Sequence, residues 1–296
     1  MAWYDAFPNL VQTNVPLSMY TWFQLGGTAE FFAEPRSVEE LSALVRSCHE
    51  ANVPIHVLGS GSNVLVRSPL VEGLVIRLAD SLPSFLDIQP ETGRVRVSGN
   101  TLLSRLITSS VQAGLGGLEE LIGIPGTVGA ALHGNIGTDT IDIGQMLVSV
   151  QLLTKSGEIV TRNASELVFS YHQSSLDDCI VLDATFELHE ENARELAQRM
   201  QKQWIIRKSL QPMSHQCAGR VFRNPMDGDS NASEIIASCG LKNLSCGDAS
   251  ISERHANYIV ADLDCTVEDI CALIEKVQAE VFQKTGISLE LELEIW

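Results

Sequence analysis

The sequence predicts an α+β nucleotide-binding fold followed by a second, smaller α/β domain. An amphipathic helix at 37–51 follows a short strand that begins at Thr21, and it precedes two apolar, strand-like segments at 53–58 and 73–78, which is a β-α-β beginning. A glycine-rich turn follows the segment at 53–58 and leads into a further apolar segment. A charged helix at 190–209 then separates this part from a short C-terminal part in which helices and strands again alternate.

The first elements follow from capping and periodicity. Ser37 is a favoured N-cap for the helix at 37–51, and Glu40, three positions later, is expected to complete a capping box. Before this helix we expect a short strand from Thr21 into the Gly26-Gly27 turn. Strands are predicted over 92–98, 147–153 and 180–188, with a helix over 101–113. The C-terminal part is predicted to contain a turn at 224–225, a helix near 231–239, a strand at 258–261, a helix at 266–284 and a final strand that ends at Trp296.

Length and composition indicate a globular protein with two domains. The 296 residues are 45% hydrophobic and 19% charged, which is enough for a sizeable core. We place the first domain, with two α+β lobes, over 1–205 and the second over 206–296. The net charge of −17 argues against a nucleic-acid partner, because phosphate binding requires a basic surface. Nothing in the sequence indicates an obligate protein partner.

Targeting signals and metal motifs are not evident in the sequence. No apolar run approaches the length of a membrane span, and the N-terminus lacks the features of a signal peptide. The seven cysteines are odd in number and form no Cys-x-x-Cys pair, so neither a disulfide framework nor a zinc site is expected. No His/Asp/Glu cluster has metal-ligand spacing. We therefore expect a cytoplasmic protein with reduced thiols, no bound metal and no membrane insertion.

Two glycine-rich segments indicate a binding site for a phosphate-containing ligand. In the turn at 59–63 (GSGSN), glycine lets the backbone approach a ligand closely, and successive N–H groups form a concave nest that suits a pyrophosphate. Gly-x-Gly-x-x-Gly is absent and the turn leads into a strand-like segment, so this is not a Rossmann fingerprint. The segment at 122–130 (IGIPGTVGA) interrupts another apolar run with a Pro-Gly turn and small residues, as a backbone packed against a flat cofactor requires.

LGSGSN followed by GLEELIGIPGTVGAALHGN resembles the FAD-binding domain of the UDP-N-acetylenolpyruvoylglucosamine reductase (MurB) family of peptidoglycan synthesis. Further matches extend to the C-terminus. The resemblance implies an FAD domain of the MurB and vanillyl-alcohol-oxidase (PCMH) type, in the shorter subclass of the family that lacks an inserted tyrosine loop. It also places the following residues at the cofactor: Gly59, Ser60, Gly61, Ser62 and Asn63 on the pyrophosphate, and Pro125, Gly126, Thr127, Gly129 and Asn135 near the flavin.

The reaction implied by the resemblance is a two-step reduction. NADPH reduces FAD, and hydride then passes to the enolpyruvyl double bond of UDP-N-acetylglucosamine enolpyruvate, which gives UDP-N-acetylmuramate. The cofactor carries the hydride chemistry, and the protein supplies position, charge and a proton. In the family an arginine in Tyr-Arg-x-Ser and a C-terminal glutamate polarise the substrate, and a serine or cysteine donates the proton. The segment GISLELE corresponds to the closing motif and assigns the glutamate role to Glu292.

Two positions depart from the family pattern. His172 stands in place of the arginine in Tyr171-His172-Gln173-Ser174, and an imidazole lacks the two-pronged fork of guanidinium. Arg220 stands in place of the serine or cysteine in CAGRVFRNP, and arginine is a poor proton donor because it stays protonated. One interpretation is that Arg220 takes over the electrostatic role, while His172, a nearby thiol such as Cys217, or water delivers the proton.

Other substrate elements of the family remain. Tyr171, Arg223 and Asn224 resemble residues at the nucleotide-sugar site, and Arg223 is suited to hold a diphosphate oxygen bidentately. In the segment SERHANY we interpret His255 as a hydrogen-bonded structural histidine. Three functions therefore stay open: an active reductase, an impaired family member that binds FAD or nucleotide sugar without efficient turnover, and a different FAD oxidoreductase on the same cofactor domain.

Overall fold

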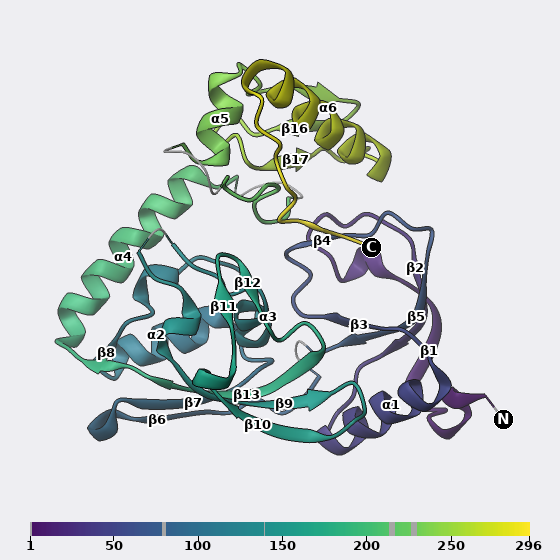
Figure 1. The fold of residues 1–296 in the computed structure, drawn as a ribbon, viewed down its shortest axis with the longest axis vertical. Helices are drawn as coiled ribbons and strands as arrows, with labels where there is room; N and C mark the ends of the chain where they lie inside the picture. The colour runs from purple at the N-terminus through teal and green to yellow at the C-terminus, as the bar shows by residue number, and fades with distance from the viewer. Residues whose placement is uncertain (1, 79–80, 139, 213–216, 226–229) are drawn as a thin grey trace. The chain divides into compact units, whose positions relative to one another are not determined.

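The fold is described from a computed structural model, drawn in Figure 1, which describes residues 2–78, 81–138, 140–212, 217–225 and 230–296. The chain divides into two compact units that draw on interleaved segments of the sequence. Unit 1 comprises Met1–Val15, Ala29–Ser60 and Glu72–Ile205; unit 2 comprises Pro16–Thr28, Gly61–Val71 and Ile206–Trp296.

The first sheet of unit 1 has four strands in the order β1-β2-β5-β3, in which β3 and β5 are parallel. Helix α1 packs on it through Leu41, Leu44 and Val45, which are buried against Leu74 and Ile76 of β5. The order β2-α1-β3 is the predicted β-α-β order, with β2 in place of the strand expected from Thr21. The bounds are β1 (Val11–Pro16), β2 (Thr28–Ala33), α1 (Val38–Ala51), β3 (Ile55–Leu58) and β5 (Leu70–Arg77).

The second sheet of unit 1 has five antiparallel strands in the order β10-β9-β13-β7-β6. Helices α2 and α3 cover one face of it (Figure 1), and Leu106 and Leu132 are fully buried in the shared core. The bounds are β6 (Leu86–Gln89), β7 (Arg94–Ser98), α2 (Leu103–Gln112), α3 (Val128–His133), β9 (Leu147–Thr154), β10 (Ile159–Asn163) and β13 (Cys179–Glu187). The two sheets are the two lobes of unit 1.

Short elements complete unit 1. Two small antiparallel pairs join β11 to β12 and β8 to β14, and helix α4 follows β14. The bounds are β8 (Leu115–Gly116), β11 (Phe169–Ser170), β12 (Gln173–Ser174), β14 (His189–Glu190), α4 (Ala193–Leu210), and the 3-10 helices η1 (Trp3–Ala6), η3 (Pro90–Thr92), η4 (Glu119–Leu121), η5 (Ile143–Met146) and η6 (Ala164–Glu166).

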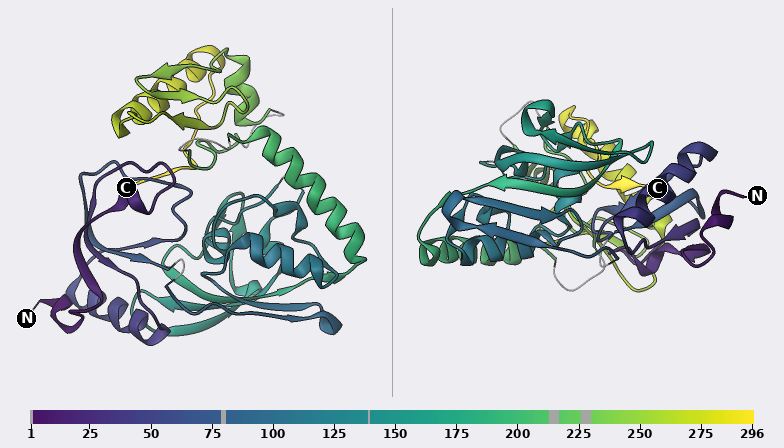
Figure 2. Two further views of the ribbon diagram at one scale, coloured as in Figure 1. Left: turned by 180° about the vertical axis from the view of Figure 1, so that it is seen from behind. Right: turned by 90° about the horizontal axis from the view of Figure 1, so that it is seen from below.

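Unit 2 is built around a small sheet, β15-β16-β17, and the helices α5 and α6 that pack with it, as Figure 2 shows from two sides. Phe23 and Leu65, from the two early segments of the chain, are buried in the same core as the C-terminal residues. The bounds are η2 (Leu17–Met19), β4 (Val64–Leu65), α5 (Ala232–Ser238), β15 (Ser245–Cys246), β16 (Ala249–Ile251), β17 (Ile259–Ala261), α6 (Val267–Thr285) and β18 (Glu294–Ile295).

Two local expectations need correction. The Ser37 hydroxyl caps α1 as expected and accepts a hydrogen bond from Glu40 N at 3.2 Å, but the Glu40 carboxylate accepts from Arg36 N rather than closing a capping box. The expected strand from Thr21 is absent, and residues 21–27 form turns and irregular chain. These residues pack against residues 61–69, where Gly26 lies close to Val66, so tertiary contacts decide their conformation.

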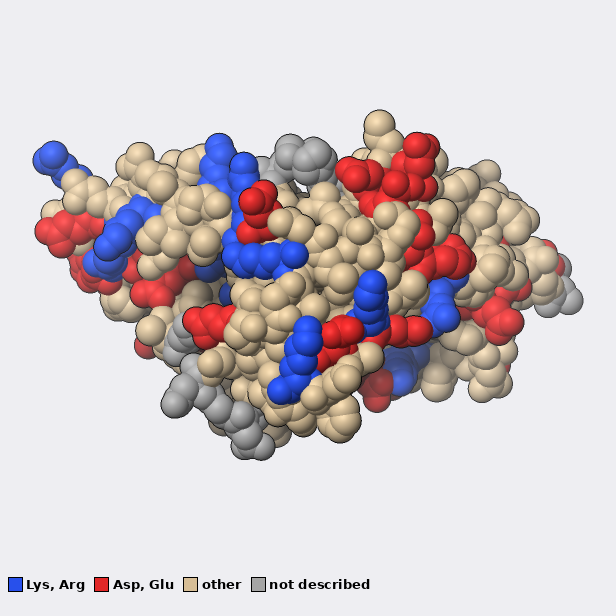
Figure 3. All heavy atoms as spheres, turned by 90° about the horizontal axis from the view of Figure 1, so that it is seen from above, with Lys and Arg blue, Asp and Glu red and all other residues tan. Residues whose placement is uncertain are grey.

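On the face drawn in Figure 3, Lys and Arg side chains lie in small groups among Asp and Glu. Within the described part of the chain, no helix is both long and apolar enough to span a bilayer.

Candidate functional site

The turn at 59–63 contains two glycines with different reasons to be glycine. Gly61 has a φ of +66°, and a Cβ there would overlap the carbonyl oxygen of Tyr20, so the protein itself requires glycine. At Gly59 the φ is not positive, and a Cβ would lie 3.4 Å from Thr127 Oγ1, which is ordinary van der Waals contact. The protein alone tolerates a side chain at 59.

The second glycine-rich segment lies beside the first within unit 1. Thr127 caps α3, and its Oγ1 accepts a hydrogen bond from Ala130 N at 3.3 Å. Gly129 N donates to Gly99 O at 2.7 Å, and Gly126 O accepts from Leu103 N at 3.0 Å. These backbone bonds hold the segment in place without large side chains. Its small residues and those of the turn fit a flat, phosphate-bearing cofactor such as FAD.

Tyr171 and His172 form the two-residue turn between β11 and β12, which lie next to α3 (Figure 1). His172 has a φ of +50°, and the rings of Tyr171 and His172 meet edge to face with centroids 4.3 Å apart. The hairpin is bound to the segment after α3, because Asn135 Nδ2 donates to Ser170 O at 2.8 Å. The predicted substrate residue Tyr171 and catalytic residue His172 therefore share one tip.

In unit 2 the later part of the turn lies against the C-terminal segment. Asn63 Nδ2 donates to Glu292 O at 2.9 Å, and Glu294 N donates to Asn63 O at 3.0 Å. Strand β18 continues this contact as a parallel pair with β4. The loop that carries Arg220 joins the same cluster, since Gly219 N donates to Ser62 O at 2.9 Å. The predicted pyrophosphate turn thus directly supports the segments that carry Glu292 and Arg220.

The surroundings of Arg220 are cationic and aromatic. Burial, and then the charge of Arg220, lowers the pKa of Arg207. Burial and Arg220 also lower the pKa of His255 to about 4, so this imidazole is neutral at physiological pH. Burial raises the pKa of Tyr258, although Arg220 and Arg207 act against it. Gln211 Nε2 donates to the Tyr258 hydroxyl at 3.0 Å. A site of this charge suits an anionic ligand.

Arg223 and Asn224 are anchored by different contacts. Arg223 N donates to Glu290 O at 2.9 Å, which fixes the backbone. Its side-chain Nε is buried and has no hydrogen-bond partner among the described residues, as expected of a donor kept for a ligand. Asn224 Oδ1 instead accepts a hydrogen bond from Ala232 N at 3.0 Å, at the start of α5. This side-chain oxygen therefore makes a structural hydrogen bond.

Sequence reasoning missed three residues near Arg220. The sequence pattern predicts only that Arg207 belongs to the charged helix at 190–209, and it assigns no role to Gln211 or Tyr258. The missed signal is the four-residue spacing of Arg207, in the last turn of α4, and Gln211, which directly follows the helix and whose N donates to Arg207 O at 2.9 Å. His255 matches its prediction as a hydrogen-bonded histidine, because its Nδ1 accepts from Asn257 N at 3.2 Å.

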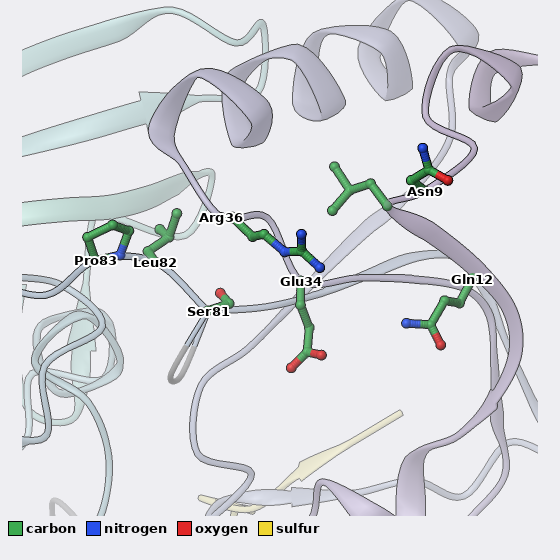
Figure 4. A pocket seen from close by; sticks show the side chains of 8 residues that line it. Asn9, Gln12, Glu34, Arg36, Ser81, Leu82 and Pro83 are labelled. Atoms are coloured by element: carbon green, nitrogen blue, oxygen red, sulfur yellow. The ribbon is translucent and has the colours of Figure 1, made fainter.

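A cavity of about 580 Å³ lies elsewhere in unit 1. Figure 4 shows Gln12, Glu34, Arg36 and Ser81 among the side chains around it. None of the predicted site residues lines it. Within the described residues, no group of three or more His, Cys, Asp or Glu side chains could hold a metal ion, and all seven cysteines are free thiols.

Family models match both parts of the chain. Residues 29–163 match the FAD binding domain, and residues 211–296 match the C-terminal domain of UDP-N-acetylenolpyruvoylglucosamine reductase. The predicted fold, an FAD-binding domain followed by a smaller domain of this type, is confirmed.

Relatives of this name match along nearly the whole chain. The UDP-N-acetylenolpyruvoylglucosamine reductase of Rhodopirellula baltica is 37% identical, over 97% of this chain and 93% of its own length. That of Anoxybacillus flavithermus is 36% identical, over 96% of this chain and 94% of its own.

Solved structures agree. The crystal structure of the reductase (MurB) from Thermus caldophilus superposes with a TM-score of 0.81 at 35% identity, covering 97% of this chain and 98% of that one. The 6-hydroxy-D-nicotine oxidase of Arthrobacter nicotinovorans, at 13% identity and a TM-score of 0.60, covering 98% of this chain and 86% of that one, shares the fold. Because its sequence is similar to these reductases over nearly its whole length, the chain belongs to the UDP-N-acetylenolpyruvoylglucosamine reductase (MurB) family.

Proposed function

We propose that this protein reduces UDP-N-acetylglucosamine enolpyruvate to UDP-N-acetylmuramate, with FAD as cofactor and NADPH as co-substrate, for peptidoglycan synthesis in the cytoplasm. One observation carries the proposal: identity of 35–37% with reductases of this name extends over nearly the whole chain. The cationic surroundings of Arg220 support an anionic nucleotide-sugar substrate.

FAD supplies hydride transfer when bound, and the protein residues hold and orient it. The space at the Cα of Gly59 supports this role. So does the segment at 122–130, which consists largely of small residues held by backbone hydrogen bonds. The proposed cofactor residues are Gly59, Ser60, Gly61, Ser62 and Asn63 at the pyrophosphate, and Pro125, Gly126, Thr127, Gly129 and Asn135 at the flavin. We assign FAD binding to a domain over 1–205 and substrate binding to a domain over 206–296, in the shorter subclass of the family.

We assign the catalytic roles to Glu292, Arg220 and His172. Glu292 and the cationic Arg220 polarise the substrate carboxylate and stabilise the charge that develops beside it. His172 then holds the proton to be delivered, and the thiol of Cys217, whose pKa burial raises, is a second protonated group near Arg220 in sequence. Tyr171, Arg223 and Asn224 bind the nucleotide sugar, and the buried Nε of Arg223 supports a contact with phosphate.

The test follows NADPH oxidation by the purified, FAD-loaded protein with and without the enolpyruvyl nucleotide. Substrate-dependent oxidation is expected. A yellow protein that oxidises no NADPH upon substrate addition would refute the proposed reaction.

A second candidate is an impaired family member, and the guanidinium at position 220 favours it. A positioned general acid contributes a factor of roughly 10² to 10⁴, and arginine cannot provide it. If the protein is impaired for this reason, Arg220→Ser raises kcat while KM changes little. If Arg220 has an electrostatic role in an active enzyme, Arg220→Ser lowers kcat, and Arg220→Lys recovers part of it.

A further inference from the structure

The side chain of Asn135 is committed to two different partners inside unit 1. Its Nδ2 donates to Ser170 O at 2.8 Å, and its Oδ1 accepts from Gly144 N at 3.1 Å. The residue is 3% exposed. One partner is an acceptor and the other a donor, so only one orientation of the amide satisfies both, and a carboxylate cannot replace it.

The backbone at this position is also specialised. Asn135 has a φ of +38°, a conformation that asparagine tolerates better than most residues. A side chain at position 144 would clash with its neighbours, because a Cβ on Gly144 would lie 2.9 Å from Asn135 Oδ1 and 2.7 Å from the ring of Phe169. The amide is therefore held tightly between residue 144 and the β11–β12 hairpin.

Two hydrogen bonds hold the hairpin on either side of its tip. Ser174 Oγ donates to His133 O at 2.8 Å, which ties the second strand to the end of α3. The bond from Asn135 ties the first strand at Ser170, one residue before Tyr171. These two bonds lie on opposite sides of the Tyr171-His172 turn and together determine where it points.

We propose that Asn135 is a positioning residue: its amide fixes the Ser170 carbonyl and so sets the direction in which the hairpin presents Tyr171 and His172 to the substrate. The inference rests on the proposed function for the roles of those two residues. It gives the side chain of Asn135 a task separate from the contact with the flavin, which is assigned to the backbone of this residue and is kept in its variants.

The test compares Asn135→Asp with the wild-type protein, both FAD-loaded. The carboxylate keeps the acceptor for Gly144 N but turns an oxygen toward Ser170 O. Two oxygens then face each other without a proton between them, so the hairpin loses this anchor, and we expect a fall of about 10-fold or more in kcat/KM and in affinity for the enolpyruvyl nucleotide measured by calorimetry. Bound FAD per chain is expected to stay unchanged. Asn135→Gly, which suits the positive φ but lacks the amide, is expected to show the same loss.

Two controls separate positioning from general damage. Asn52→Asp makes the same chemical change at an exposed asparagine that also has a positive φ, and is expected to leave all readouts unchanged. In a double-mutant cycle with His172→Ala, Asn135→Asp is expected to add little further loss, because both act through one tip.

Additive losses in that cycle, or unchanged kinetics and affinity for Asn135→Asp, would overturn the inference. A loss of FAD would overturn it too, because the amide would then serve the cofactor. If the wild-type protein binds the nucleotide without turning it over, the proposed reaction fails, while the calorimetric ratio between variant and wild type still decides the role of Asn135.

Discussion

Replacing His255 by glutamine should make the stability of the protein less sensitive to acid. Burial and the charges of Arg220 and Lys242 lower the pKa of His255 to about 4, from an ordinary value of 6.5. Its Nδ1 accepts a hydrogen bond from Asn257 N, and a proton on that nitrogen would break the bond. A pKa lower by about 2.5 corresponds to at most about 3.4 kcal/mol. Because the ring is partly exposed, we expect about 2 kcal/mol.

The sign follows from proton linkage. The pKa of His255 is lower in the folded than in the unfolded protein, so between about pH 6.5 and pH 4 the unfolded chain binds a proton that the folded chain does not. The contribution of the neutral imidazole to the free energy of unfolding is therefore fully present above about pH 6.5 and is lost as the pH falls toward about 4.

Urea unfolding at a series of pH values, with excess FAD, measures this effect. Between about pH 7 and pH 4.5 the wild-type protein is expected to lose about 2 kcal/mol more stability than His255→Gln. The exposed His49 provides a matched control, and His49→Gln should follow the wild type. Equal losses for the wild type and His255→Gln would refute the reasoning, because they would mean that His255 has similar pKa values in both states.

Two further predictions concern unit 1. Arg199 donates a hydrogen bond to the carboxylate of Glu119, which is 6% exposed. Burial raises the pKa of Glu119, but the hydrogen bonds to this carboxyl, those from Gly117 N and Arg199 among them, and the charge of Arg199 together lower it by more. Arg199→Ala should lower the free energy of unfolding by about 1–3 kcal/mol, with partial recovery in Arg199→Lys; no change in urea unfolding would contradict this. Gly59→Ala should fold with near-wild-type stability but bind FAD about 10-fold or more weakly, measured by titration of the apoprotein. Unchanged FAD affinity would argue against a close approach of cofactor to this backbone.

Much of the fold follows from local sequence signals. The α1 helix begins at its predicted cap, α6 begins after Thr266, and β7, β9 and β13 lie within one or two residues of the predicted strands. Alternating or continuous apolar patterns predict such elements because each buries one face in its own unit. Strand β1 was not predicted, since its mostly exposed, polar residues carry little hydrophobic pattern, and β6 was not predicted because its alternation of apolar and polar residues extends over only four positions.

The functional site is predicted less completely. Motif resemblance predicts the glycine turn, the Pro-Gly segment and Glu292, and the family models confirm an FAD-binding domain and a reductase C-terminal domain. It does not predict that Asn63 donates to Glu292 O, or that Tyr258 and Arg207 surround Arg220. These contacts join residues far apart in the chain, and no periodicity encodes them.

The sequence by itself determined the class of fold and the family, because helix caps, glycine turns and motif spacing are local properties. Only the tertiary structure decided which atoms the predicted site residues use. It bonds the amide of Asn135 to the hairpin, engages the Asn224 acceptor at α5, and leaves the Nε of Arg223 buried without a hydrogen-bond partner among the described residues. The physical reason is that a polar side chain can satisfy its hydrogen bonds with many partners, and the folded chain brings only some within reach.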